Sequence, residues 1–368
     1  MPKKNDYSKF IEHLRSGVMD LPDSEYLTPL LEASLTAEEA RFLSDFPFQP
    51  HTSEQLAEKF NIPENELRSK LDSLAKRGII FWLQSGNTVN YALSSHWFMF
   101  YRSPYWAGKR DKKTKKLAKF ANLYFYHGMG KEFGGYPTMF LRAIPIERTI
   151  EDTRQFRPYE DVIEIVRQKD YICVGHCSCR QMKNLDPDSI SCKHETLNCL
   201  HFGGLARYMV KQGMGKEISR EEATEILLKA ADAGLVHAVE NAKTGIESIC
   251  NCCSCCCVFM QSAHVLGLRG HEPSNYIVDI RGGTCKGCEL CVKRCPMDAV
   301  RLEASPEANN KVGKCAVADF QRCIGCGVCV HKCPTHSLQL VHRKEEQDIP
   351  EEFKDLRVRQ AKARGKKV

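Results

Sequence analysis

Two runs of cysteine near the C-terminal end of the chain have the residue types and the spacing of metal ligands. The first starts at Cys285 and the second at Cys323, and each reads C-x2-C-x2-C-x3-C-P. Three thiolates on one tight loop and a fourth at the start of a helix suit the irons of a [4Fe–4S] cluster. The second run repeats the first at a constant offset of 38 residues in all four cysteines. This repeat predicts two [4Fe–4S] clusters.

The repeated segment, residues 281–340, resembles the bacterial ferredoxins that carry two [4Fe–4S] clusters. In those proteins the fourth cysteine of each run binds the other cluster. The resemblance implies electron transfer and two ligand sets, with cluster I held by Cys285, Cys288, Cys291 and Cys333, and cluster II by Cys323, Cys326, Cys329 and Cys295.

A second cysteine-rich region lies upstream, with six cysteines in the eight residues from Cys250 to Cys257. Neighbouring side chains point in different directions in any regular local structure, so these six cannot all bind one metal. We expect one or two additional [4Fe–4S] clusters that draw ligands from both ends of the region, namely from Cys177, Cys179, Cys192, Cys199, Cys250, Cys252, Cys253 and Cys256.

Zinc is the chief alternative for these thiols, because C-x-C and C-x2-C segments also hold it tetrahedrally. Free thiols are a further alternative. We favour iron–sulfur clusters, since they would extend the electron path of the other two clusters and zinc would not. Cys173 and Cys315 lie outside the best spacings and are expected to be free or buried thiols. His176, His194 and His201 are expected to be structural.

Three short sequence motifs in this region resemble those of multi-cluster ferredoxin-type proteins of anaerobes. They are His-Cys-Ser-Cys-Arg at 176–180, Cys-Leu-His-Phe-Gly at 199–203 and Ile-Cys-Asn-Cys-Cys at 249–253. The resemblance covers about residues 144–340. It implies a role in electron transfer and in anaerobic metabolism, without naming an electron donor or acceptor.

The N-terminal part of the chain predicts three helices, over residues 37–44, 54–60 and 64–76, followed by a β-hairpin around residues 85–87. This order resembles a winged helix-turn-helix. A DNA-reading helix presents basic or amide side chains to phosphates and base edges. The third helix offers Arg68, Lys70, Lys76 and Arg77, which Glu64, Glu66 and Asp72 offset. We therefore favour a role in protein interaction or oligomerisation over DNA binding.

These segments together predict a multidomain α+β protein. We expect a winged-helix-like domain over residues 1–100, an aromatic and basic connecting region over 101–157, and a mainly helical Cys-rich metal domain over 158–270. A ferredoxin-like domain over 271–342 and a charged tail over 343–368 complete the chain. Charge runs of this kind are usually solvated, and we expect the tail to be disordered.

Composition narrows the function classes. The 368 residues include 20 cysteines, yet the chain opens on polar residues with no apolar signal segment and has no apolar run of membrane-spanning length. Dense thiols without export favour metal binding in a reducing, cytoplasmic compartment over a disulfide framework. The segment 281–340 has nine Lys/Arg and five Asp/Glu, a formal charge of +4, which favours a redox partner with an acidic docking surface.

We find no nucleophile with a base beside it, no dinucleotide fingerprint and no phosphate loop. The sequence therefore predicts a non-catalytic electron carrier, or the wiring subunit of an oxidoreductase complex. Two alternatives stay open. One is a redox-sensing regulator that binds DNA through the winged-helix-like part, and the other is an oxidoreductase with an open-site cluster at residues 173–257.

Overall fold

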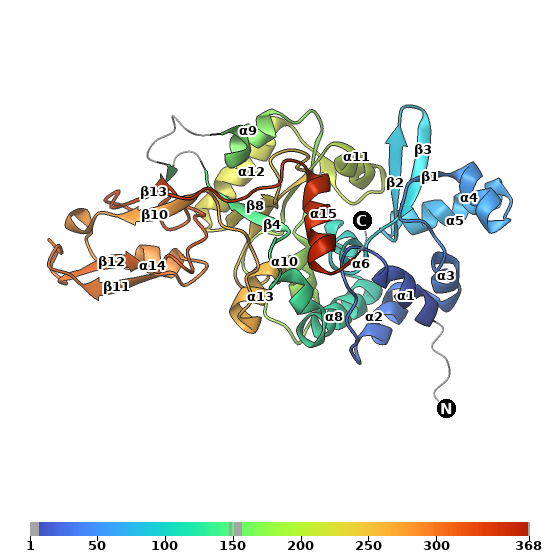
Figure 1. The fold of residues 1–368 in the computed structure, drawn as a ribbon, viewed down its shortest axis with the longest axis horizontal. Helices are drawn as coiled ribbons and strands as arrows, with labels where there is room; N and C mark the ends of the chain where they lie inside the picture. Colours follow the sequence, from blue (N-terminus) through green and yellow to red (C-terminus); the bar gives the residue numbers. More distant parts are fainter. Residues whose placement is uncertain (1–6, 147–148, 151–156, 367–368) are drawn as a thin grey trace.

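The structure is a computed structural model that describes residues 7–146, 149–150 and 157–366. The molecule is elongated, and a six-stranded sheet with its helices occupies the middle (Figure 1). The strands before, within and after the cysteine repeat lie at one end, and the N-terminal helices with a small three-stranded sheet lie at the other (Figure 1). The chain is thus a mixed α+β protein of several units. In the described residues, no helix has both the length and the apolar character that crossing a membrane requires.

The N-terminal unit contains the predicted helices and hairpin within a residue or two of their expected bounds. Thr36 and Thr52 each accept a hydrogen bond from the backbone N–H three residues on, and each starts a helix with a full capping box. The strands form a sheet in the order β1-β3-β2. The elements are α1 (Ser8–Arg15), α2 (Leu27–Ser34), α3 (Ala37–Leu43), β1 (His51–Thr52), α4 (Ser53–Phe60), α5 (Glu64–Lys76), β2 (Ile80–Ser85) and β3 (Thr88–Leu93).

The N-terminal unit is joined to the middle of the molecule through helix α11 (Gly203–Lys211). The hydroxyl of Tyr208 on α11 donates to the carbonyl oxygens of Ala75, at 2.9 Å, and Ile80, at 3.2 Å. Its ring also packs edge-on against Phe81 of β2. The hairpin is therefore part of a continuous core and is held against the cysteine-rich region.

An aromatic layer follows the hairpin, on α6 (His96–Tyr101), α7 (Ser103–Trp106) and α8 (Lys112–His127). Trp97, Phe100, Tyr105 and Trp106 are all buried. These aromatic residues pack between the N-terminal unit and the middle of the molecule.

The centre of the molecule is an antiparallel sheet in the order β4-β8-β9-β6-β5-β7. Helices α9 and α12 cover one face of it, where Val162 and Leu227 pack against Val174 and Leu200. The strands are β4 (Leu141–Ile144), β5 (Ile172–His176), β6 (Leu197–Phe202), β7 (Lys216–Glu217), β8 (Val236–Glu240) and β9 (Ser248–Cys252). The helices of this part of the chain, besides α11, are η1 (Met129–Phe133), η3 (Pro158–Glu160), α9 (Val162–Arg167), α10 (Ser178–Leu185), α12 (Arg220–Asp232) and α13 (Val258–Leu266). The expectation of a mainly helical region thus missed its central element.

The C-terminal cysteine repeat lies on two antiparallel strand pairs, β10–β13 and β11–β12. The long spacer between the two cysteine runs forms the β11–β12 hairpin, with Val300 opposite Ala318 and Ala304 opposite Lys314. The elements are β10 (Tyr276–Ile280), η4 (Gly282–Thr284), α14 (Leu290–Arg294), β11 (Val300–Ala304), β12 (Lys314–Ala318) and β13 (Leu338–His342).

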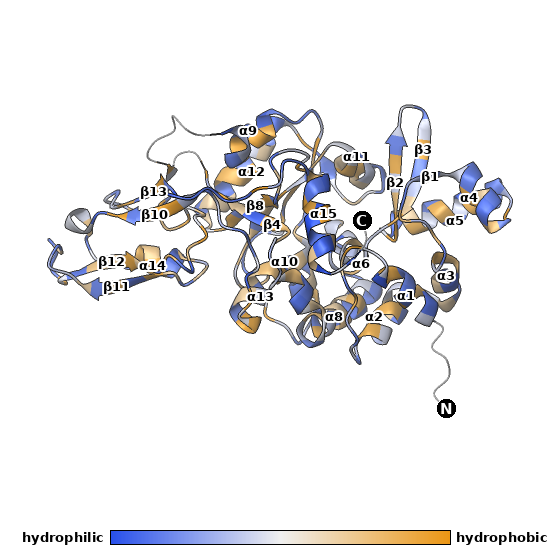
Figure 2. Cartoon of the chain, viewed as in Figure 1, coloured by the Kyte–Doolittle hydropathy of each residue, from blue (hydrophilic) through white to orange (hydrophobic). Residues whose placement is uncertain are grey.

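The charged tail is not disordered, contrary to the expectation. Helix α15 (Phe353–Ala363) is hydrophilic over most of its length, yet it runs back to the N-terminal half (Figure 2). After it, the Arg364 guanidinium lies 2.9 Å from the Glu132 carboxylate, and both side chains are buried, with 2% and 6% exposed. Lys366 donates to the carbonyl oxygens of Arg15 and Gly17. Buried ion pairs of this type require a partner for each charge, so the tail has a defined place.

Candidate metal centres

The predicted ligands of cluster II lie around one small cavity of about 20 Å³. Its wall is otherwise mostly apolar and includes Ile324, Val300 and Leu340. Burial raises the pKa of Cys326 to about 12, so this thiol keeps its proton at neutral pH until a metal displaces it. The four cysteines on the cavity are those of the predicted set, Cys295, Cys323, Cys326 and Cys329.

The predicted ligands of cluster I include one exposed cysteine. Cys285 and Cys291 are buried, Cys333 is half-buried and Cys288 is exposed. Burial raises the pKa of Cys291 to about 11, and the neighbouring Cys285 and Cys288 thiols add to this shift. One edge of this site therefore reaches the solvent.

Two glycines let the loop of the second cysteine run approach its surroundings closely. Gly325 has φ +66°, and a Cβ there would lie 2.0 Å from the Tyr276 carbonyl oxygen. Gly327 has φ +73°, and a Cβ would lie 2.7 Å from Thr149 Oγ1. Only glycine combines this backbone region with this proximity. The loop geometry thus fits the tight turn that a cluster requires.

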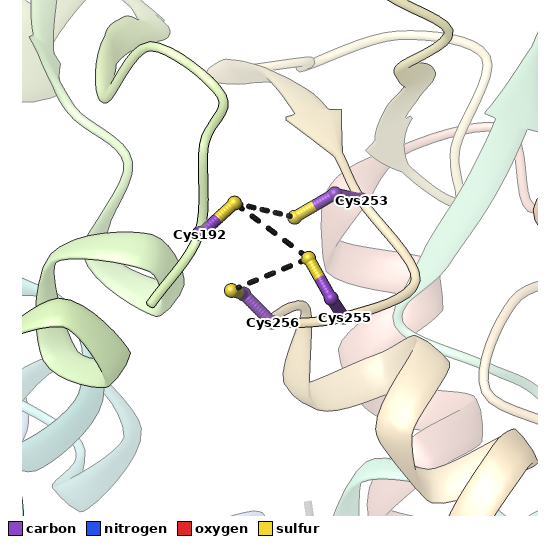
Figure 3. Close-up of side chains that lie close together, drawn as sticks. All are labelled: Cys192, Cys253, Cys255 and Cys256. Carbon is purple, nitrogen blue, oxygen red and sulfur yellow. Dashed lines mark hydrogen bonds between the residues drawn. The ribbon is translucent and has the colours of Figure 1, made fainter. Parts of the chain in front are cut away.

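The thiols of the upstream region divide into two groups. The first, which we call the turn site, consists of Cys192, Cys253, Cys255 and Cys256, whose sulfur atoms all lie within 4.8 Å of one another (Figure 3). The second, which we call the buried array, is a chain of neighbouring thiols that runs Cys177, Cys179, Cys257, Cys252, Cys250 and Cys199.

Sheet register positions the buried array. Cys250 and Cys252 are two residues apart on β9, so their side chains lie on the same face of the strand. Leu200 of β6 pairs with Ile249 of β9, which brings Cys199 beside Cys250. On the next strand, β5 ends at His176, and Cys177 and Cys179 follow at the start of α10. Residues about fifty apart in sequence thereby meet.

His271 joins the buried array at Cys252 and Cys257. A ring nitrogen of His271 and the two sulfur atoms lie within 4.8 Å of one another, and all three side chains are buried. Nε2 of His271 is buried and has no hydrogen-bond partner. Such an orphaned nitrogen beside thiols fits the ligand set of a metal centre.

A buried arginine faces the array. Arg102 is 3% exposed, and its guanidinium lies among the rings of Trp97, Phe98 and Trp106, 5.3 to 5.7 Å from their centroids. Burial acts to lower its pKa, but nearby thiols, Cys250 foremost, raise it overall. Nη2 of Arg102 has no hydrogen-bond partner. A buried cation needs a negative charge nearby, and a thiolate-ligated metal centre would supply it.

A second buried arginine lies between the array and the turn site. Arg180 is fully buried and donates to the carbonyl oxygens of Glu195 and Asn251. The thiols nearest to it belong to both groups, Cys177 to the array and Cys253 to the turn site, and they raise its pKa against the effect of burial. Both groups therefore fit centres of negative charge.

The structure thus brings together the eight upstream cysteines predicted as ligands, but in two groups. Cys192, Cys253 and Cys256 are in the turn site, and the other five are in the array. The prediction missed Cys255, Cys257 and His271. The position of Cys255 and Cys257 depends on the turn after β9, and His271 carries no spacing signal in the sequence.

The remaining candidates are outside both groups, although His201 interacts with Cys250 of the array. Cys173 is buried with its sulfur 4.0 Å from that of Met209, and Cys315 is buried and donates to the Gly282 carbonyl oxygen at 3.2 Å. Nδ1 of His176 lies 2.8 Å from the Thr196 hydroxyl, and Nδ1 of His201 lies 3.0 Å from the Ser248 hydroxyl. Each of these side chains has a partner within the protein, but Nε2 of His201 is buried without one.

Comparison with known proteins identifies the C-terminal part of the chain. Residues 284–338 match the model of the 4Fe-4S dicluster domain. A domain of this family implies two [4Fe–4S] clusters, as the cysteine repeat predicts. No curated protein and no solved structure matches the chain. The match does not extend to the N-terminal unit or to the buried array and the turn site.

Proposed function

We propose that this protein is an iron–sulfur electron-transfer protein in which the buried array holds a further redox centre beside the dicluster domain. The proposal rests on one observation above all. Cluster II ligand Cys326 and its neighbours Ile324 and Val328 belong to the same continuous apolar core as Cys252 and Cys257 of the array. The dicluster domain therefore turns its cluster II side, and not its exposed Cys288 side, toward the main core of the molecule, to which these array cysteines also belong.

Specific polar contacts hold the dicluster domain in this orientation. Arg294 of α14 donates to the carbonyl oxygens of Ala231, at 2.9 Å, and Asp232, at 3.1 Å, at the end of α12. Lys332 lies 2.9 Å from the Asp232 carboxylate. His264 of α13 lies 2.9 Å from the Pro296 carbonyl oxygen. These contacts flank Cys295 and Cys333, the fourth cysteines of the two runs, and fix where the ligand sets lie relative to the array.

Iron–sulfur clusters, when bound, supply one-electron redox centres whose potentials depend on charge, hydrogen bonding and burial. The protein contributes these influences through its own residues. Arg102 and Arg180 place positive charge beside the array, and the surrounding aromatic rings exclude water. At cluster II, the backbone N–H of Ala299 donates to Cys295 Sγ at 3.2 Å. Each contact stabilises negative charge on sulfur.

The opposite side of the dicluster domain suits a redox partner. Cys288 is exposed there, and the same domain carries the exposed apolar side chains of Val312 and Phe320, with 57% and 59% exposed. The formal charge of +4 over residues 281–340 favours a partner with an acidic docking surface. We propose that the protein acts as an electron carrier or wiring subunit in the cytoplasm.

The regulator alternative receives less support from the N-terminal unit. Arg68 of α5 forms an ion pair with Glu64 at 2.7 Å, and Lys70 lies 3.4 Å from Glu38. Arg77, just after α5, pairs with Glu39. Basic side chains already paired within the molecule contribute less to phosphate binding. We therefore favour protein interaction for this unit over DNA binding.

The test is metal and sulfide analysis with EPR and redox titration of the anaerobically purified protein. Two dicluster-domain clusters account for about eight irons. We expect more than eight, and a further EPR signal that disappears in the double variant Cys252→Ser, Cys257→Ser. The matched control is Cys173→Ala, a buried thiol outside the array, which should keep every signal. A wild-type protein with about eight irons and no further redox-active centre would contradict the proposal.

A further inference from the structure

The turn site differs in geometry from the two predicted ligand sets of the dicluster domain. Cys192 Sγ lies 3.9 Å from Cys253 Sγ and 3.6 Å from Cys255 Sγ, and Cys255 Sγ lies 3.6 Å from Cys256 Sγ (Figure 3). No disulfide joins these cysteines, and all four thiols are free. Four sulfur atoms so close together surround a space the size of one atom.

These distances match a single tetrahedral ion. A zinc–sulfur bond of about 2.3 Å and tetrahedral angles place the sulfur atoms about 3.8 Å apart. In a [4Fe–4S] cluster each thiolate binds a different iron at a different corner, so the sulfur atoms must lie farther apart. The dicluster domain serves as an internal comparison. Among the described residues, its eight ligand cysteines form no group of three sulfurs within 4.8 Å.

We propose that Cys192, Cys253, Cys255 and Cys256 bind one divalent metal ion tetrahedrally, with zinc as the expected ion. A single iron has the same ligand chemistry and is distinguished by the test. This inference does not depend on the proposed electron-transfer function. It assigns the turn site a chemistry different from that of the buried array, and it explains why the chain has more thiols in this region than one cluster needs.

Local structure prepares the four thiols. Backbone N–H groups of Cys256 and Cys257 donate to the Cys253 carbonyl oxygen, at 3.4 and 3.1 Å, and close a tight turn that gathers three of the ligands. The fourth comes from a separate loop, where the Cys192 N–H donates to Asn184 Oδ1 at 2.8 Å. The site is thus assembled from two segments, each fixed by its own hydrogen bonds.

The surroundings suit the charge of such a centre. A divalent ion with four thiolates carries a net charge of −2. The backbone N–H of His194 donates to Cys192 Sγ, and the buried Arg180 interacts with Cys192 and Cys253. Ala230 and Leu235 pack against Cys253 and Cys256 and shield one side. Hydrogen bonds to sulfur and a nearby cation are typical second-sphere support for a metal–thiolate site.

The bound ion would fasten the middle of a loop that is otherwise held at its two ends. Residues 186–196 contain no helix or strand, and Ile190 in this loop is 53% exposed. The loop is held at its start, where Asn122 donates to Asp186 at 2.8 Å and Lys119 lies 2.7 Å from Asp188. It is held at its end, where Arg180 donates to the Glu195 carbonyl oxygen and His176 Nδ1 lies 2.8 Å from the Thr196 hydroxyl. The ion would join the middle of this loop to the turn after β9, and zinc would do so without carrying electrons.

The experiment uses the full-length protein purified anaerobically. Zinc K-edge absorption of the wild type should show four sulfur ligands at about 2.3 Å, with about one zinc per chain. Cys192→Ala and Cys255→Ala should each lose that one metal while iron and sulfide stay unchanged. Cys315→Ser, which alters a buried thiol outside all four sites, should keep the full metal content.

If iron occupies the site, the same variants lose about one iron and no sulfide. Mössbauer spectra of the wild type then show an isolated tetrahedral iron. This outcome also supports the proposal. Loss of about four irons together with sulfide would overturn it, since a cubane cluster would then occupy the turn site. A wild type with neither zinc nor isolated iron would overturn it as well. The wild-type spectra decide the matter even where a variant does not fold.

Discussion

His331 of the dicluster domain contacts Asp232 at the end of α12, with the imidazole Nε2 2.6 Å from the carboxylate Oδ1. The His331 side chain is 7% exposed and that of Asp232 is 55% exposed, so the pair lies at the rim of the domain interface. The hydrogen bond from His331, followed by that from Lys332, lowers the pKa of Asp232 to about 2. This pair, together with the Lys332 contact, holds the dicluster domain against α12 in the middle of the molecule.

The first prediction concerns this rim contact. Asp232→Asn should loosen the dicluster domain, and amide hydrogen exchange should be faster in α14 and in residues 328–333. The free energy of unfolding is expected to fall by at most about 1 kcal/mol, because an exposed pair is screened by solvent. Glu225→Gln removes an α12 carboxylate that pairs only with Lys229 on the same helix, and should leave exchange there unchanged. Equal exchange in both variants would show that the pair does not hold the domain.

The pH dependence of the same contact follows from the lowered pKa. A carboxyl group whose folded pKa lies below its unfolded value stabilises the fold above the unfolded pKa. The contribution of Asp232 should therefore be complete at neutral pH and disappear as the pH falls from about 4 toward about 2.

The second prediction concerns Gly325. Gly325→Ala should displace the loop of cluster II, because the new Cβ would lie 2.0 Å from the Tyr276 carbonyl oxygen at a φ of +66°. We expect loss of about four irons, measured with acid-labile sulfide on the purified variant. Gly283→Ala is the control, since nothing lies within 4 Å of its Cβ position. Full iron content in Gly325→Ala would show that the loop can rearrange.

The third prediction concerns Glu240, which is buried on β8. Burial, followed by the nearby Glu247, raises the pKa of Glu240 to about 7. The folded state then holds a proton that the unfolded state releases above about pH 4.5, so stability should fall as the pH rises from 4.5 to 7. By pH 8 the free energy of unfolding can fall by about 3 kcal/mol from its value at low pH.

Glu240→Gln checks this pH dependence. The amide oxygen can still accept from the N–H groups of Glu247 and Ser248, and it does not ionise. Denaturant unfolding of the anaerobic protein between pH 5.5 and 8 should show a shallower loss of stability in the variant. Parallel curves for the two proteins would mean that Glu240 keeps its ordinary pKa.

The fourth prediction concerns Arg102 and depends on the proposed redox centre at the buried array. A cation beside a centre favours its reduced, more negative state. Arg102→Met should therefore lower the midpoint potential of that centre by tens of millivolts. Arg102→Lys keeps the positive charge, so its midpoint potential should stay close to that of the wild type. Redox titration followed by EPR measures both. The signals of the dicluster domain serve as the internal reference, and an unchanged potential in Arg102→Met would place the centre elsewhere.

The parts of this structure that could be predicted are those that depend on local sequence. The capping boxes at Thr36 and Thr52 and the Leu67, Leu71, Leu74 stripe fix helices within a few residues. The cysteine repeat is local too, because each run supplies three ligands from one loop. These features needed no knowledge of the tertiary fold.

The central sheet escaped prediction because its strands are short and buried, with no clear alternation. Strand β8, Val236–Glu240, is buried at every position, including His237 and Glu240. Without the sheet, the register that joins Cys199 to Cys250 could not be known. The division of the upstream thiols into two groups therefore depends on information that no single segment contains.

The anchoring of the C-terminal residues has a consequence for biosynthesis. Lys366 binds the carbonyl oxygens of Arg15, Gly17 and Met19, 347 to 351 residues away in the chain. At 5–20 residues per second, the ribosome takes roughly 20 to 70 s to produce the chain between these contacts. During this interval the N-terminal helices lack their final partner and the thiols emerge one segment at a time. The contact between Lys366 and the N-terminal segment can therefore form only after every cysteine of the chain has been synthesised.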